Sequence, residues 1–524
     1  MVSSKSFLAF SLKCLASFVA THLSNSSVAA AGAAALPAHH AQRSADAATR
    51  LHEMTSDLGP RLSRGALIYT PGSEQFDILT ERWQLFAPPT FIAVVVAKSE
   101  RDVELTVQLA NRFGLPWLAV SGHHGAINSL GTFKQGIQIS MESFNEVKLS
   151  PDGRTARIGG GTLSKKITDT LWAEGKQNVT GACECTSLVG PMLGGGHGWL
   201  QGRNGLSADQ LISARVVLPN GRLVTVSKDS AYSDLFWGLQ GAGHNFGIVT
   251  QVEYKVYDVS ENGGADWTYA NLIFKQDKLE AVFSLINTIT NNGTGDISYI
   301  DFVWFQHIPE IDATSPILSV YMVYQGTPLH AQKYIDMYTA LRPANSTIIA
   351  TDYTHISSLT GNGNDGLACA HGAYYALRFP TGFETYNLST VRNLFDKFAD
   401  ITSAQPGFNN SFFLFEDYST RGVQAVDAAS TAVPDRFNHH LVSPVIIYFD
   451  PLLGEEAVRA GKELRGLAME GKTGLLNAYV NYAHGDEGVG GWYGHEGWRI
   501  ERLRGLKRRY DPENRVGYYA PIGV

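Results

Sequence analysis

Two glycine-rich segments, about sixty residues apart, constrain the fold of this chain more than any other feature. Residues 121–125 read Ser-Gly-His-His-Gly, and residues 181–185 read Gly-Ala-Cys-Glu-Cys before a run of glycines at 194–198. Glycine permits a positive φ and a close approach of backbone to ligand, and the N–H groups of such loops bind phosphate. Each segment also carries a nucleophilic side chain. Together they indicate a flavin dinucleotide that is cradled by backbone and covalently tethered.

A strand–helix–strand unit leads directly into the first segment. A β-branched apolar run predicts a buried strand over residues 91–97, helical spacing predicts a helix over 100–113, and a second strand is expected over 116–120. The glycine segment follows this second strand at once. Ligands of α/β proteins usually bind at such strand ends, so the unit predicts a binding site there.

The pattern changes near residue 258. Before it, strands are expected at 157–161, in a pair over 211–226 turned at Pro219-Asn220-Gly221, and at 248–256, with a helix over 163–175. After it, strands at 272–274, 299–305 and 317–324 and helices at 278–290 and 329–341 predict a mixed sheet with helices on one face. Within the apolar run 441–448, Pro444 predicts an edge strand or a strand that begins after it.

The length of 524 residues exceeds what one hydrophobic core supports, so two lobes are expected. The predicted class is α+β. The net charge of −7, without a long basic run, argues against a nucleic-acid partner.

The first 35 residues have the pattern of a secretory signal peptide. Lys5 precedes an apolar stretch over 7–23, and small residues over 28–35 offer cleavage sites. Lys13 interrupts the apolar stretch, so a membrane anchor is not expected. The sequence therefore predicts a secreted protein. N-glycosylation sequons, which weakly support this route, occur at Asn178, Asn292, Asn345, Asn387 and Asn409.

Loss of the signal peptide would remove Cys14. Three cysteines, an odd number, would remain: Cys183, Cys185 and Cys369. The odd thiol is free, paired between chains, or bonded to a cofactor. Cysteines separated by one residue do not easily pair with each other. A disulfide from Cys369 to Cys185 is conceivable, and it would leave Cys183 for other chemistry.

Several common motifs are missing. The glycines at 194–198 do not have the G-x-G-x-x-G spacing, and no G-x-S-x-G occurs. His495-Glu496 lacks the second histidine of H-E-x-x-H, and His439-His440 has no obvious partners, so no metal site is predicted.

Taken together, the motifs resemble those of the berberine bridge enzyme-like oxidoreductases, within the vanillyl-alcohol oxidase/p-cresol methylhydroxylase (PCMH) flavoprotein superfamily. The resemblance covers residues 88–257 and 477–521 and is weaker between them. It implies a two-lobed FAD-binding PCMH-type fold with a substrate lobe built on a mixed or antiparallel sheet. The implied flavin lobe comprises residues 60–257 and the tail 476–524, and the implied substrate lobe comprises residues 258–475. The segments that carry the resemblance are residues 119–125, 181–198, 234–237, 241–250, 479–482 and 502–512.

The resemblance also implies how the flavin is held. His124 matches the histidine that bonds to the flavin 8α-methyl group, and Cys183 matches the cysteine that bonds to flavin C6, with Cys185 as a nearby rival. His123 stands where members usually have glycine. The implied cofactor-binding set is His124, Cys183, Ser121, Gly122, His123, Gly125, Gly194, Gly195, Gly196, Gly198, Ile248 and Asn514.

The same resemblance implies a catalytic base near the flavin. Tyr479, in the segment Tyr-Val-Asn-Tyr, is the first candidate, and Tyr482 and Tyr493 are second choices. A phenol has an ordinary pKa of about 10 and needs a nearby cation or hydrogen bond to act at neutral pH. Arg499 and Lys507 are candidate cations.

The implied activity is that of an FAD-dependent oxidase. It would oxidise a C–OH or C–NH group of a small molecule, with hydride transfer to flavin N5 and reoxidation by O2. Residues 518–522 and the Cys-Glu-Cys loop resemble fungal members, which favours a specialised-metabolite intermediate as substrate. The alternatives are a secreted carbohydrate oxidase and, in another class, a flavin-containing non-redox cyclase or binding protein. Oligomeric state is not predicted.

Overall fold

The computed structural model describes residues 38–372, 374–438 and 440–523. The predicted signal peptide at 1–35 lies outside the described residues. From Arg50 onward the chain forms one compact unit. None of the helices within the described ranges is both long and apolar enough to cross a membrane.

The first sheet carries the strand that leads to the first glycine segment. Its order is β1 (Leu67–Tyr69), β2 (Phe91–Val96), β4 (Gly136–Ser140) and β3 (Trp117–Val120), with β2, β4 and β3 parallel. Helix α4 (Glu100–Arg112) connects β2 to β3 and begins at a capping box formed by Ser99 and Asp102. The predicted strand–helix–strand unit is confirmed to within a residue or two at each end.

The second sheet is antiparallel and follows in the chain. Its order is β5 (Val147–Leu149), β6 (Thr155–Gly159), β10 (Ile248–Lys255), β8 (Leu211–Val217) and β9 (Leu223–Ser227). The predicted turn over residues 219–221 joins β8 and β9. Strands β7 (Lys176–Gln177) and β11 (Tyr257–Asp258) pair as a separate two-stranded sheet. The shorter helices of this half of the chain are α3 (Glu74–Thr80), between β1 and β2, and α5 (Ser164–Ala173), α6 (Val189–Leu193), α7 (Gln201–Asn204) and α8 (Ser233–Ala242).

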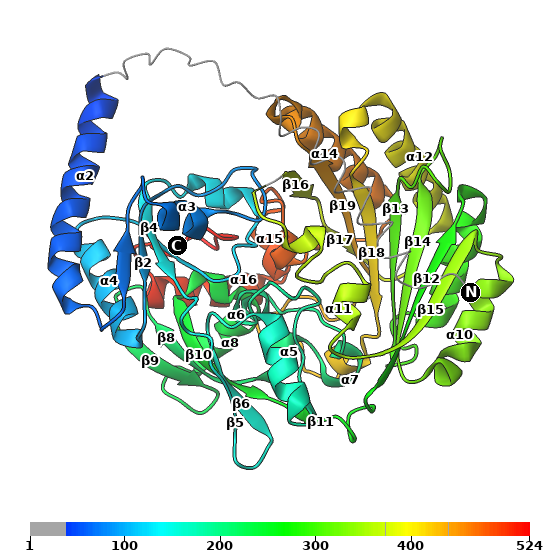
Figure 1. Cartoon of the computed structure of the whole chain (residues 1–524), viewed down its shortest axis with the longest axis horizontal. Helices are drawn as coiled ribbons and strands as arrows, with labels where there is room; N and C mark the ends of the chain where they lie inside the picture. The colour runs from blue at the N-terminus through cyan, green and yellow to red at the C-terminus, as the bar shows by residue number, and fades with distance from the viewer. Residues whose placement is uncertain (1–37, 373, 439, 524) are drawn as a thin grey trace. The chain divides into compact units, whose positions relative to one another are not determined.

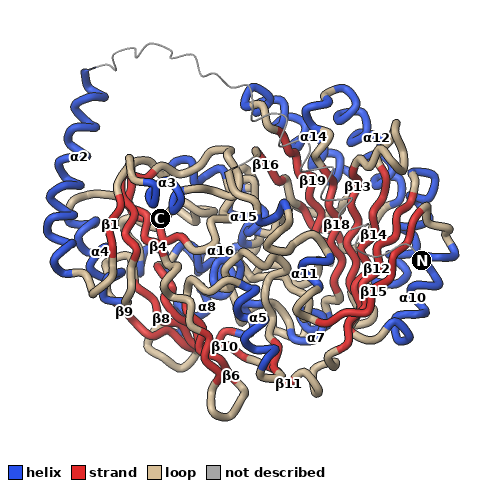
Figure 2. The backbone as a smooth tube through the Cα atoms, viewed as in Figure 1, coloured by secondary structure: helices blue, strands red, loops and turns tan. Residues whose placement is uncertain are grey.

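An eight-stranded sheet occupies the second half of the chain, and all of its pairings are antiparallel. Figure 2 shows its strands as one red band, with helices α10, α12 and α14 beside it. The strands in order are β15 (Asn345–Asp352), β12 (Asp266–Phe274), β14 (Ile317–Gln325), β13 (Tyr299–Gln306), β18 (Phe412–Tyr418), β19 (His440–Tyr448) and β16 (Tyr375–Arg378), with β17 (Thr381–Phe383) also paired to β19.

Helices cover one face of this sheet, as predicted. Apolar side chains of α9 (Leu279–Thr290), α10 (Pro328–Ala340), α12 (Leu388–Ala404) and α14 (Gly454–Glu470) form one buried core with alternate residues of the strands (Figure 1). The opposite face is free of these helices and carries the side chains discussed below. Two one-turn helices, α11 (Ile356–Leu359) and α13 (Arg421–Gln424), lie in the connections.

The prediction for Pro444 is wrong. Strand β19 runs through this proline in the interior of the sheet, between β18 on one side and β16 and β17 on the other. Strand β17 pairs with residues 440–442 and β16 with residues 445–448, so Pro444 falls in the gap between two short partners. A missing N–H is tolerated there, because no ladder bond is required at that position.

The C-terminal tail packs on the first half of the chain. Helices α15 (Gly488–Tyr493) and α16 (Gly497–Tyr510) contribute Tyr493, Leu503 and Leu506 to a core that also contains Trp237 of α8. Together, the two smaller sheets, the large sheet and their helices confirm the predicted α+β class.

One of the predicted glycosylation sequons is buried in the folded chain and cannot be modified there. Asn178 is 0% exposed, and its backbone carbonyl accepts a hydrogen bond from the Tyr353 hydroxyl at 2.8 Å. A glycan needs an accessible side chain. The remaining sequons are exposed at Asn292, Asn387 and Asn409 and half-buried at Asn345.

Candidate active site

The first glycine segment places His124, half-buried, shortly after the end of β3. The imidazole stacks on the Trp83 ring, with 5.4 Å between centroids, and its Nε2 lies 3.1 Å from the Cys185 sulfur. Burial, helped by the charges of His371 and Arg82, lowers the pKa of His124 to about 3. The imidazole is therefore neutral at neutral pH and keeps a lone pair for nucleophilic attack.

The backbone of this segment has a conformation at position 123 that favours glycine. His123 has φ of 60°, in the left-handed region that glycine adopts most readily. Its Nδ1 lies 2.9 Å from the Glu81 carbonyl oxygen, which fixes the ring. A Cβ on Gly122 would lie 2.8 Å from the Cys185 carbonyl oxygen. The first segment and the Cys-Glu-Cys loop are therefore in backbone contact, as a shared ligand site requires.

The three cysteines of the described residues gather in the same place. A disulfide joins Cys185 to Cys369, which confirms the pairing that the sequence left open, and Cys183 is free. The Cys183 sulfur lies 3.4 Å from that of Cys185 and 3.7 Å from that of Cys369. Burial raises the pKa of the Cys183 thiol to about 11, so the thiol is protonated at neutral pH.

The geometry at His124 also resembles a metal site. Ligand atoms of His124, Cys183 and Cys185 lie within 4.8 Å of one another. Cys185 is bonded to Cys369, however, and a disulfide sulfur is not the thiolate that a metal ion requires. The cluster is therefore better described as a nucleophile cluster in this state.

The glycines at 194–198 pack against the Tyr-Val-Asn-Tyr segment of the tail. A Cβ on Gly194 would lie 2.3 Å from Asn481 Oδ1, so this contact requires glycine. The Tyr479 oxygen accepts hydrogen bonds from the His197 N–H at 3.3 Å and from Asn481 Nδ2 at 2.7 Å. Burial nevertheless raises the pKa of Tyr479 to about 12. Tyr479 is held as a positioned phenol beside the glycine loop.

Tyr482 forms a buried acid–phenol pair with a residue of the large sheet. Its hydroxyl donates to Glu416 Oε1 at 2.8 Å, and the Tyr418 hydroxyl donates to Oε2 at 3.0 Å. Glu416 is 3% exposed, and burial raises the pKa of its carboxyl. Burial likewise raises the pKa of Tyr482. A carboxylate accepting from a phenol is the arrangement of a general base that acts through a relay.

Arg378 of β16 connects the two groups of side chains. Its guanidinium lies 4.1 Å from the centroid of the Tyr482 ring. Its positive charge lowers the pKa of both His124 and Cys183, although burial has the larger effect on each. Among the described residues its Nη1 is buried without a hydrogen-bond partner. An orphaned buried donor at this position suits an acceptor atom of a bound ligand.

Other predicted site residues lie elsewhere. The Tyr493 hydroxyl donates to the Ala520 carbonyl at 2.7 Å within the tail core. Both candidate cations are also engaged there: Arg499 donates to the Thr431 carbonyl at 2.9 Å, and Lys507 pairs with Asp511 at 2.6 Å.

Two residues of the implied cofactor-binding set lie in other parts of the fold. Ile248 is 3% exposed and pairs with Val217 in β10 and β8, and Asn514 is exposed in the turn after α16.

Sequence reasoning missed Glu416 and Arg378. The available signal was Phe-Phe-Leu-Phe-Glu-Asp-Tyr at 412–418, where two acids stand in an otherwise apolar strand. A charge inside such a strand needs a partner. The alternation of β18 sends Phe413, Phe415 and Asp417 toward the helices. Glu416 therefore points to the other face, toward Tyr482.

The sheet face that carries Glu416 is aromatic. Trp304 and Phe412 stack there, with 4.6 Å between ring centroids, and Trp304 also packs against Tyr321. Phe302 is the cross-strand partner of Glu416 and therefore shares its face. Such a surface favours a substrate with a flat apolar part.

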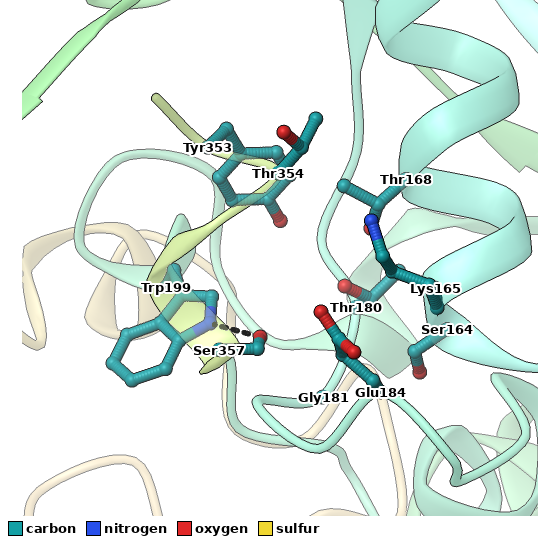
Figure 3. A pocket seen from close by; sticks show the side chains of 10 residues that line it. All are labelled: Ser164, Lys165, Thr168, Thr180, Gly181, Glu184, Trp199, Tyr353, Thr354 and Ser357. Atoms are coloured by element: carbon teal, nitrogen blue, oxygen red, sulfur yellow. Dashed lines mark hydrogen bonds between the residues drawn. The ribbon is translucent and has the colours of Figure 1, made fainter. Parts of the chain in front are cut away.

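A small polar pocket lies beside the Cys-Glu-Cys loop rather than at the acid–phenol pair. Figure 3 shows the Lys165 amine and the Glu184 carboxylate turned toward the same space, with Trp199 donating to the Ser357 hydroxyl at 3.3 Å. Within the part of the chain that the structure describes, its lining does not include Tyr482. The pocket is therefore separate from the candidate catalytic pair.

Comparisons with known proteins agree with this geometry. A family described as FAD binding domain matches residues 91–227, and one described as berberine and berberine like matches residues 478–516. The FAD-linked oxidoreductase chyH of Penicillium rubens is 40% identical over 471 residues, which cover 89% of this chain and 93% of that protein.

Solved structures share the fold at lower identity. BBE-like 1 of Physcomitrella patens superposes with a TM-score of 0.77 at 18% identity, covering 90% of this chain and 99% of that one. Glucooligosaccharide oxidase from Acremonium strictum, described with a 6-S-cysteinyl, 8α-N1-histidyl FAD, gives 0.75 at 19% identity, covering 90% and 98%. These structures confirm the predicted two-lobed fold.

Proposed function

Because the chain belongs to the berberine bridge enzyme-like family of FAD-linked oxidoreductases, we propose that it oxidises a C–OH or C–NH group of a small specialised-metabolite intermediate. The observation that carries the proposal is the buried Glu416–Tyr482 pair, which shares the Arg378 guanidinium with His124 and Cys183. A proton acceptor and two nucleophiles around one cation suit a tethered flavin with an adjacent base.

The residues present fit an FAD. The backbone of the first glycine segment and of residues 194–198 would hold the dinucleotide, and His124 would form the covalent link. Arg378 Nη1, buried without a partner among the described residues, would donate to an acceptor atom in the site. Cys183 would form a second link once its thiol loses a proton. The described linkages of the Acremonium strictum oxidase supply a chemical precedent for both bonds.

The protein's part in the reaction is to take a proton. The substrate O–H or N–H gives its proton to the Tyr482 oxygen, and the phenol passes its own proton to Glu416 Oε1, 2.8 Å away. Because the raised pKa of Tyr482 disfavours a free phenolate, the carboxylate acts as the base through the phenol. Arg378, over the ring face, stabilises the developing negative charge. A bound flavin would supply the oxidising chemistry, as the acceptor of a hydride from the carbon that bears this O–H or N–H group.

The relay predicts a defined pH dependence. Glu416 must be ionised to receive the proton, and burial raises the pKa of its carboxyl above the ordinary value. Lowering the pH protonates it, so kcat/KM should fall on the acid side at a higher pH than for an exposed glutamate. A kcat/KM profile with the best panel substrate checks this. An acid limb that persists unchanged in Glu416→Gln would assign it to another group.

The covalent link is tested on full-length protein denatured in acid. We expect flavin fluorescence to remain with the wild-type chain on a gel, and digestion with mass spectrometry to find flavin on the peptide that contains His124. His124→Ala should lose this peptide-bound flavin, because the imidazole is the attacking nucleophile. Cys183→Ala should keep the histidine link. Wild-type protein without any flavin would refute the central proposal.

A second candidate substrate class is carbohydrate. The polar pocket beside the Cys-Glu-Cys loop, with Lys165 and Glu184 facing it, is the observation that favours a hydroxyl-rich ligand. A panel of oligosaccharides, aromatic alcohols and cyclic amines, assayed by anaerobic flavin bleaching and by peroxide release, separates the two classes. Bleaching without peroxide would point to an acceptor other than O2, and no bleaching by any ligand that binds would favour a non-redox role.

Secretion belongs to the same proposal. Cys185–Cys369 is a disulfide in the folded chain, and such bonds persist mainly in oxidising compartments. This agrees with the signal pattern expected for the first residues.

A further inference from the structure

Cys183 is a free thiol in contact with a disulfide. Its sulfur lies 3.7 Å from that of Cys369 and 3.4 Å from that of Cys185. Thiol–disulfide exchange requires a thiol within this reach of a disulfide. We propose that Cys183 and Cys185 exchange as partners of Cys369, so that the disulfide isomer decides which sulfur is free to tether the flavin. The inference rests on the proposed function, since a tether has meaning only in a flavoprotein.

The exchange needs no external oxidant or reductant. Cys183 loses its proton, and its thiolate attacks Cys369 Sγ. A Cys183–Cys369 bond forms while the Cys185–Cys369 bond breaks, and the electron pair leaves on Cys185, which takes up the proton. The products again contain one disulfide and one thiol. The Cys185 sulfur, which this step frees, lies 3.1 Å from Nε2 of His124, the other proposed flavin link.

Attack on the other sulfur of the disulfide is disfavoured. It would join Cys183 to Cys185 across a single residue, and disulfide geometry requires separations that neighbours in the chain rarely reach. Exchange is therefore confined to Cys369, which remains bonded in both isomers. This makes Cys369 a positioning residue, because it withdraws one of two competing thiols from the site.

The chain around Cys369 is held in place independently of the sulfurs. We refer to residues 353–369 as the strap. The Glu184 N–H donates to the Asn362 carbonyl at 3.0 Å, and its carboxylate accepts from the Asn364 N–H at 2.9 Å and the Ser358 hydroxyl at 3.3 Å. Glu184 stands between the two competing cysteines, so these bonds keep both sulfurs within reach of the strap during exchange.

The surroundings of Cys183 also determine how the rate of exchange depends on pH. Backbone N–H groups of Cys185 and Thr186 and the charge of Arg378 favour its thiolate, whereas burial opposes it more strongly. Because only the thiolate attacks, exchange in the folded chain is slow at neutral pH and faster in alkali. The isomer present when the flavin binds therefore persists.

Disulfide mapping of full-length variants tests the proposal. Free thiols are alkylated in acid, and fragment ions that break the chain at Glu184 assign each label to Cys183 or Cys185. In Cys185→Ser we expect a Cys183–Cys369 disulfide and flavin attached only to the His124 peptide. Cys183→Ser is the matched control, and it should keep Cys185–Cys369 and the same single link. In Cys369→Ser both thiols are free and a second link returns.

The opposite result is equally clear. If Cys369 is alkylated in Cys185→Ser while Cys183 remains linked to flavin, the two cysteines do not compete and the proposal fails. If no variant carries flavin on any peptide, the proposed covalent attachment fails, whereas the disulfide map of Cys185→Ser still decides the competition for Cys369. The two failures are thus separable.

A pH series reads the exchange directly. The flavin-free fraction of full-length His124→Ala, in which Cys183 is not bonded to flavin, is incubated at increasing pH, quenched in acid and labelled. We expect label on Cys185 to appear about tenfold faster for each pH unit, as the thiolate fraction rises below the thiol pKa. Label confined to Cys183 at every pH would overturn exchange in the folded chain.

Discussion

Replacing Glu416 with glutamine should lower the rate of flavin reduction by about 10²–10⁴-fold, the usual contribution of a positioned general base. The amide keeps the size of the side chain and can still accept from the Tyr482 hydroxyl, which lies 2.8 Å from Oε1 in the native chain. It cannot take the proton. Anaerobic stopped-flow bleaching with the best panel substrate measures the loss. Flavin content should not change, because Glu416 lies on the sheet and not in the glycine loops.

Asp417 supplies the matched control. It is the neighbouring acid, equally buried, but it faces the helices, where its carboxylate accepts from the Tyr386 hydroxyl at 2.6 Å. Asp417→Asn should lower Tm and leave the bleaching rate unchanged. Tyr482→Phe should lose as much rate as Glu416→Gln, and the double variant little more, because the two act as a unit. Equal rate losses in Asp417→Asn and Glu416→Gln would remove the catalytic assignment.

Replacing Arg436 with alanine should destabilise the protein by about 3–5 kcal/mol, the cost of leaving one member of a buried ion pair alone. Arg436 donates to both oxygens of Asp209, at 2.8 and 3.0 Å, and the side chains are 1% and 4% exposed. Residues 207 and 208, beside this aspartate, donate backbone hydrogen bonds to Gly196 and Gly195. The loss should therefore also loosen the surroundings of the tethered flavin at a lower urea concentration. Unfolding in urea, followed by tryptophan and flavin fluorescence, measures both effects.

Arg392→Ala is the comparison at the surface. Arg392 pairs with Glu280 at 2.7 Å, but the side chains are 26% and 45% exposed. Solvent screens this pair, so its loss should cost less than about 1 kcal/mol. Unfolding of both arginine variants at the same urea concentration would contradict this prediction. The buried Arg436–Asp209 pair would then contribute no more to the free energy of unfolding than the exposed Arg392–Glu280 pair.

Local signals predicted the local structure well. The strand–helix–strand unit over 91–120 follows from apolar periodicity, which involves neighbours in the chain. Positions of the glycine loops follow for the same reason. The family resemblance added the two-lobed arrangement, which the comparisons confirm. His124 and Cys183 as flavin ligands stay a prediction.

The features that could not be predicted from the sequence depend on contacts between residues far apart in the chain. Cys185 and Cys369 are 184 residues apart, so the pairing was only one possibility until the strap was seen against the Cys-Glu-Cys loop. On the sequence alone Tyr479 is the first candidate for the base and Tyr482 a second choice, and only the position of Glu416, 66 residues before Tyr482, shows which phenol is hydrogen-bonded to a buried carboxylate. Pro444 was misread because the gap between β16 and β17 is a property of the assembled sheet.

The alternation along β18 has a consequence for how this enzyme can be diversified. Glu416 faces the site and Asp417 faces the helices because β18 keeps one register against β13 and β19. Inserting or deleting one residue in this strand would exchange the faces of every side chain that follows. New substrate ranges are therefore accessible by point replacement at the site-facing positions 412, 414 and 418, or by changing connecting loops. Insertions or deletions inside β18 are not a usable way to change the substrate range, because they would move Glu416 or its neighbours to the wrong face of the sheet.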